Sequence, residues 1–143
     1  MKTIALRFGE TFSPECGTIK AHQYVIEQLG YVWYGKLGSS ISDRVINDIL
    51  KEKVKKILLI HSGGVDRYWA YYDEISKSVP DSGIPSYYED NADKFKVWFK
   101  ITKIEKAEKD VMSKYVVISS QNMLSEASKK SMNPCFYIEC IEG

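Results

Sequence analysis

The segment KKILLIHS, at residues 55–62, constrains the fold of this chain more than any other. Its uninterrupted apolar run predicts a strand that is buried on both faces near the centre of a sheet. Gly63 and Gly64 follow and allow a tight turn, and RYWAYYDEIS at residues 67–76 then predicts a strand that pairs back as a hairpin. The centre of the fold is therefore expected to be a hairpin whose first strand is buried.

Two helices have recognisable ends. Thr18 is a suitable N-cap for the first, whose apolar residues recur at helical spacing, and Gly30 is placed to end it. Ser42 is a suitable N-cap for the second, and Ile41 and Ile46 have the spacing of a hydrophobic staple. The second helix is the strongest helix prediction in the chain.

Further strands are predicted at residues 3–8, 31–34, 93–108, 115–118 and 135–141, and a short helix at 123–129. Hairpin-like neighbours outnumber alternating strand–helix units, which disfavours a doubly wound parallel sheet. We expect an α+β fold, a curved and mostly antiparallel β-barrel of about six strands with two or three short flanking helices. No linker divides residues 1–143, so we expect one domain, and its ending just after a strand hints at excision from a larger protein.

Composition narrows the class of protein. The chain of 143 residues has a net charge of +1, which argues against a uniformly basic protein but leaves a local basic face open. Its three cysteines lack metal or redox spacing, which is typical of reduced thiols in the cytoplasm. We find no signal peptide or membrane span, and we expect a soluble cytoplasmic protein with no membrane partner.

The common catalytic motifs are absent from the sequence. There is no Walker loop and no GxGxxG motif. His22 and His61 are the only histidines and lie far apart, so we expect no metal site and no cofactor. His61 and Ser62 are neighbours on a strand and point to opposite faces, which prevents the usual nucleophile–base pair. We therefore expect a binding domain rather than an enzyme, with no catalytic residues.

The strand around FKVWFKIT carries the clearest indication of a site. Alternation places Phe95 on an apolar face and Lys96, Trp98 and Lys100 on the other. An exposed Trp among lysines can stack a base while the lysines neutralise phosphates. The alternative is that Trp98 packs under the loop at 79–91, with the lysine stems lying over it.

Two further clusters have mixed aromatic and polar character. In YVWYGKLGSSIS, Trp33 and Tyr34 precede Lys36, whose ammonium could meet a phosphate, and Ser39 and Ser40 could donate to phosphate oxygens. The other cluster is His61 and Ser62, a polar pair that ends the buried strand beside two glycines. Such a pair often opens onto a pocket.

Taken in order, these features resemble the EVE and YTH group of the PUA-like superfamily, small β-barrel domains that read modified bases in nucleic acids. The resemblance is carried by VWYGK with Trp33, the helix from Asp43, KILLIHSGG with His61, the strand YWAYYDEI, and IPSYYED leading to FKVWFKI with Trp98. The opening ETFSPECGTIKAHQYVIEQLGYVWYGKLG also resembles N-terminal domains of McrB-type modification-dependent restriction proteins.

The resemblance implies a PUA-like fold that binds DNA and holds a flipped, modified base in an aromatic cage. It also implies a role in a restriction or defence system, with an AAA+ GTPase domain in the same full-length chain. The expected base-binding residues are Trp33, Tyr34, His61, Ser62, Tyr87, Tyr88 and Trp98. The expected phosphate-binding residues are Lys36, Ser39, Ser40, Lys96 and Lys100.

Two other readings stay open. The domain could bind structured or modified RNA through the same pocket. It could instead be an inhibitor or adaptor whose tyrosine-rich strand at residues 68–72 contacts a protein partner.

Overall fold

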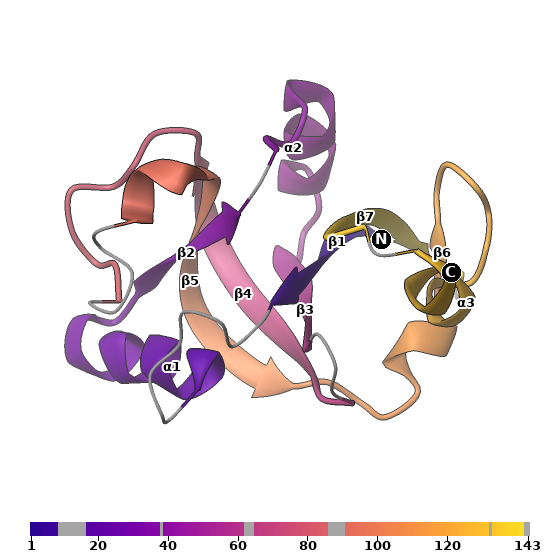
Figure 1. The fold of residues 1–143 in the computed structure, drawn as a ribbon, viewed down its shortest axis with the longest axis horizontal. Helices are drawn as coiled ribbons and strands as arrows, with labels where there is room; N and C mark the ends of the chain where they lie inside the picture. Colours follow the sequence, from indigo (N-terminus) through magenta and orange to yellow (C-terminus); the bar gives the residue numbers. More distant parts are fainter. Residues whose placement is uncertain (9–16, 38, 62–64, 86–90, 132, 142–143) are drawn as a thin grey trace.

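The computed structural model describes residues 1–8, 17–37, 39–61, 65–85, 91–131 and 133–141 (Figure 1). Its strands are β1 (Lys2–Phe8), β2 (Val32–Leu37), β3 (Lys56–His61), β4 (Arg67–Ser76), β5 (Phe95–Lys106), β6 (Tyr115–Val117) and β7 (Cys135–Cys140). Its helices are α1 (Thr18–Leu29), α2 (Asp43–Leu50) and α3 (Leu124–Lys130), with a short 3₁₀ helix, η2 (Val111–Ser113). Each predicted strand and helix is present, with ends close to those expected.

The strands form one seven-stranded mixed sheet in the order β2-β5-β4-β3-β1-β7-β6. β1 lies beside β3 in parallel, with Ala5 opposite Leu58, and all other paired neighbours in the described residues are antiparallel. The expected hairpin of β3 and β4 is present. The prediction of an α+β fold with a mostly antiparallel sheet is therefore confirmed.

The expected closed barrel is not formed, because β2 and β6 remain at opposite edges of the sheet. β6 has only three residues and pairs with β7 alone among the named strands. Its residues pack with α3 and η2 in a cluster that also holds Ala5 of β1, Leu58 of β3 and Trp69 of β4. β6 and α3 lie at the end of the molecule where both termini lie (Figure 1). The sheet therefore stays open, with β2 and β6 as its two edge strands.

β3 is buried on both faces, as the sequence predicts. Ile57 and Leu59 enter the cluster that packs against α1 and α2, whereas Leu58 and Ile60 enter the cluster that contains α3. All four side chains are almost wholly excluded from solvent. We call the first side of the sheet the α1–α2 face and the second the α3 face.

The ends of α1 agree with the prediction at one terminus and differ at the other. Gly30 ends the helix in the left-handed conformation, with φ of 83°, and its N–H donates to the carbonyl oxygen of Ile26 at 2.7 Å. At the start, Gly17 is the N-cap and Thr18 is already helical and buried, which corrects the predicted N-cap by one residue. None of the helices described here has the length and hydrophobicity that a membrane-spanning segment requires.

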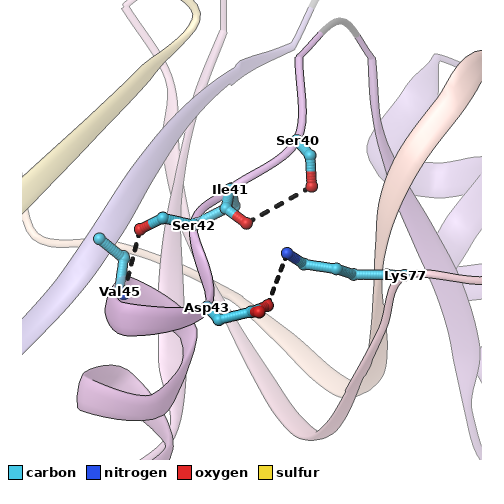
Figure 2. Close-up of polar contacts among 6 residues, drawn as sticks. All are labelled: Ser40, Ile41, Ser42, Asp43, Val45 and Lys77. Atoms are coloured by element: carbon cyan, nitrogen blue, oxygen red, sulfur yellow. Dashed lines mark hydrogen bonds and ion pairs between the residues drawn. The ribbon is translucent and has the colours of Figure 1, made fainter.

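The start of α2 is built as predicted. The backbone N–H of Val45 donates to Ser42 Oγ at 3.3 Å, which satisfies one of the open donors of the first turn. Asp43 lies in that turn, where a carboxylate is favoured by the helix dipole, and Lys77 Nζ approaches its Oδ1 at 2.7 Å (Figure 2). The helix is therefore tied to the chain that leaves β4.

The pairing of β4 with β5 shifts register twice. Tyr71 lies opposite Lys103 and Tyr72 opposite Ile101, so Thr102 is an extra residue on β5. Glu74 then lies opposite Lys100, which makes Asp73 an extra residue on β4. Such bulges change the phase of alternation along a strand. As a result Ile104 packs with Ile101 on the α1–α2 face, and Lys103 lies beside Tyr71 on the other.

We expect Ser42→Ala to lower the free energy of unfolding by about 1 kcal/mol, because it removes the cap of α2. Urea denaturation followed by circular dichroism measures this change. Ser40→Ala is the matched control, since within the described residues Ser40 Oγ has a single long hydrogen bond, to the carbonyl oxygen of Ile41 at 3.4 Å (Figure 2). Equal stability of the two variants would show that the cap contributes nothing.

Candidate nucleic-acid interface

The predicted site residues are divided between the two faces of the sheet. Neighbouring residues of a strand point to opposite sides. On β2, Tyr34 therefore joins the core of the α1–α2 face, and Trp33 packs on the other side with Trp98. The structure does not bring all the predicted base-binding residues into one cage. Ser62, Tyr87 and Tyr88 lie outside the described residues.

Trp98 is fully buried, which corrects the expectation that it stands exposed among lysines. Its ring meets that of Phe95 edge to face, with centroids 5.5 Å apart, and Ala92 belongs to the same cluster. Trp33 and Ile84 pack against the outside of this cluster. Alternation placed Trp98 on the side away from the α1–α2 face, as predicted, but Phe95 lies on the side of Trp98 and not on that of Val97, because the pairing of β2 with β5 shifts register at Lys96. Ile84 and Ala92, which lie between β4 and β5, cover Trp98, as the alternative held.

Trp33 is only partly buried and lies at the edge of this cluster. Its backbone N–H donates to the carbonyl oxygen of Gly83 at 2.8 Å, which holds the segment after β4 against β2. Gly83 has φ of 81°, and a Cβ there would lie 2.5 Å from Tyr31 Cε2. Glycine is thus required at a point where the backbone meets two aromatic residues, and it is the signal that sequence reasoning missed.

Lys100 lies directly across the strand pair from Trp33. Its Nζ stands 4.8 Å from the centroid of the Tyr31 ring and 3.5 Å from Glu74 Oε2. Lys96, four residues before Lys100 on β5, is exposed. Tyr31, Trp33, Gly83 and Lys100 together form a partly exposed surface with aromatic and cationic groups, which we call the Trp33 surface.

Lys36 does not lie at the surface, which corrects its predicted role as a phosphate ligand. The residue is 5% exposed, and its Nζ donates to the carbonyl oxygen of Ser39 at 2.6 Å. Burial raises the pKa of the Cys135 thiol, and the charge of Lys36 opposes that rise. The Lys36 ammonium therefore makes its contact inside the protein, with the backbone of the turn that follows β2. Ser39 and Ser40 in that turn are both exposed.

A second aromatic group lies on the α1–α2 face. The His61 ring lies 5.0 Å from that of Phe8, which in turn lies 6.3 Å from Tyr68. Tyr34 is buried with its ring 5.1 Å from His22. Tyr34 and His61 thus share a face of the sheet, but each has a different aromatic neighbour.

His22 is a buried histidine of the core. Desolvation lowers its pKa to about 4, although a hydrogen bond between Nδ1 and the carbonyl oxygen of Thr18 opposes the shift. The imidazole is therefore neutral at pH 7. Within the described part of the chain, no three His, Cys, Asp or Glu side chains are grouped so as to hold a metal ion.

The chain is similar in sequence to a known protein family. A protein-family model described as Pua-like matches residues 4–134, nearly the whole chain. Neither the curated proteins nor the solved structures that were compared give a match.

We expect the stability of the protein to fall as the pH is lowered from 6.5 toward 4. In this interval the unfolded chain protonates His22 and the folded chain does not, so the loss amounts to at most ~3 kcal/mol. Urea denaturation at pH 7 and pH 4.5 measures it. His22→Gln should show a smaller loss over this interval. Equal pH dependence of wild type and His22→Gln would contradict the assignment.

Proposed function

Because the chain belongs to the Pua-like family, whose domains generally bind nucleic acids, we propose that it reads a modified base in DNA at the Trp33 surface. The base is presented unpaired, or is flipped out of the duplex, and it stacks on the ring of Trp33. The protein is a binding domain in this proposal and carries out no reaction of its own.

The observation that carries the proposal is the position of a partly exposed Trp33 opposite a lysine on the neighbouring strand. Stacking of a base on an aromatic side chain contributes ~1–3 kcal/mol to binding. Lys100 is held by Glu74 and by the face of Tyr31, and both contacts are weak enough to exchange for a phosphate. One ring for a base and one cation for its phosphate therefore lie side by side.

The burial of Trp98 changes the role proposed for it. Its ring cannot stack a base while Phe95, Ala92 and Trp33 cover it, but it supports Trp33 from beneath. Gly83 holds the chain close to the rings of Tyr31 and Trp33. A rigid, supported ring loses little conformational freedom on binding, which favours affinity.

The preference for a modified base rests on the resemblance to EVE, YTH and McrB-type domains. On that basis we propose that the domain directs a modification-dependent restriction or defence system, such as one with an AAA+ motor, to its DNA. RNA recognition through the same surface is the alternative that the first experiment separates.

We expect a fluorescence-anisotropy panel at one salt concentration to show tighter binding to one modified duplex. The panel holds duplexes with unmodified, methylated or hydroxymethylated cytosine or methylated adenine, together with matching single-stranded DNA and RNA. Flat, weak binding across the panel would refute nucleic-acid binding, and tightest binding to RNA would replace DNA with RNA as the ligand.

We expect Trp33→Ala to weaken binding of the preferred probe by ~1–3 kcal/mol, because it removes the stacking ring. Lys100→Gln should weaken binding of all probes similarly and reduce the salt dependence by about one phosphate contact. Tyr24→Ala is the matched control, since Tyr24 is 63% exposed on α1, away from the Trp33 surface. Wild-type affinity in folded Trp33→Ala would exclude this surface as the site.

A further inference from the structure

A second set of aromatic and lysine side chains crosses the middle of the sheet on the α3 face. Lys56 on β3 lies opposite Tyr71 on β4, and Tyr71 lies opposite Lys103 on β5. Cross-strand neighbours of this kind have Cβ atoms ~5 Å apart and share one surface. We call these three residues the Tyr71 row. None of them is fully buried.

The lysines of the row flank the ring of Tyr71. Lys103 Nζ lies 5.4 Å from the ring centroid and Lys56 Nζ lies 5.8 Å from it. Lys56 Nζ also stands 4.1 Å above the ring of Trp69, which is buried beneath it. A cation near an exposed ring contributes only ~0.5–1 kcal/mol, so the ammonium groups can exchange these contacts for phosphates.

Tyr71 is held in place from the neighbouring strand. Its hydroxyl donates to Glu105 Oε1 at 2.6 Å, and Lys103 Nζ lies 3.3 Å from the other oxygen of that carboxylate. The hydrogen bond to Glu105 raises the pKa of Tyr71 to about 12, so the phenol keeps its proton at pH 7. The ring is therefore fixed in orientation before any ligand arrives.

The Tyr71 row lies on the same face as the Trp33 surface. Lys100 of that surface and Lys103 of the row are both on β5, on either side of the bulge at Thr102. From β3 to β2 the sheet crosses three gaps between strands, about 14 Å in total. This distance corresponds to about four stacked bases at ~3.4 Å each, so one strand of nucleic acid can reach both places.

We propose that Tyr71, Lys56 and Lys103 form a second contact for the same nucleic acid, which binds unpaired nucleotides beside the base at Trp33. This inference rests on the proposed function. A base stacks on Tyr71 while the two lysines meet the phosphates that flank it. Paired bases in a duplex have both faces covered by their neighbours, so the row selects a single-stranded segment.

The test uses the full chain and two fluorescein-labelled probes, a 12-nucleotide single-stranded DNA and a blunt duplex that carry the same central base. We expect Tyr71→Leu to weaken binding of the single strand about tenfold and binding of the duplex less than twofold. Tyr71→Phe keeps the ring and loses only the hydrogen bond to Glu105. Its affinity for the single strand should therefore lie between those of the wild type and Tyr71→Leu. Tyr24→Leu is the matched control on α1.

A second measurement depends on charge alone. The double variant Lys56→Gln/Lys103→Gln should reduce the slope of log Kd against log salt for the single strand by about 1.4. Lys20→Gln/Lys129→Gln removes the same charge from exposed positions on α1 and α3 and should leave the slope unchanged. Circular dichroism and thermal unfolding establish that each variant is folded.

The outcomes separate this inference from the function on which it rests. If Trp33→Ala loses affinity while the Tyr71 and double-lysine variants bind like wild type, the second contact is refuted and the function stands. Equal losses for single strand and duplex in Tyr71→Leu would also refute it, because the row would not be selecting unpaired bases. If the wild type binds neither probe, both proposals fail.

Discussion

The pairing of β1 with both β3 and β7 is the interaction on which the rest of the molecule depends. β1 joins the N-terminal residues to a strand more than fifty positions later and to one near the C-terminus. Its alternating side chains also enter both halves of the core, since Leu6 packs on the α1–α2 face and Ala5 on the α3 face. Contacts of such long range cost loop-closure entropy, which the burial of apolar side chains on both faces must offset.

The sequence predicts local structure well because its determinants are local. The apolar run of β3, the Ser42 cap and the Gly30 stop are each contained within a few residues, and the structure confirms all three. The open sheet was not predicted, since whether β2 meets β6 depends on strands that lie far apart in the chain. The burial of Trp98 was left undecided for the same reason, because alternation gives the face of a side chain and not what covers that face.

In the candidate interface too, the features set within one strand were predictable and those set by strand pairing were not. Trp33 and Lys100 were identified from their own strands, and the pairing of β2 with β5 places them opposite one another. Tyr71, Lys56 and Lys103 come from three strands, so their row exists only once the register is known. The prediction for Lys36 was wrong. A lysine that follows aromatic residues on a strand indicates an exposed charge, but Lys36 lies in the interior.

The bulge at Thr102 limits which sequence changes β5 can accept in evolution. Before it, Val97, Phe99 and Ile101 of β5 face α1 and α2, and after it Ile104 does. A substitution in β5 alters one side chain, whereas straightening the bulge with Thr102 kept in the strand would exchange the inward and outward sides of everything that follows. Lys103 and Glu105 would then turn toward the core and Ile104 toward solvent. The irregular backbone at Thr102 therefore keeps Ile104 on the same side as Ile101, although three positions separate them.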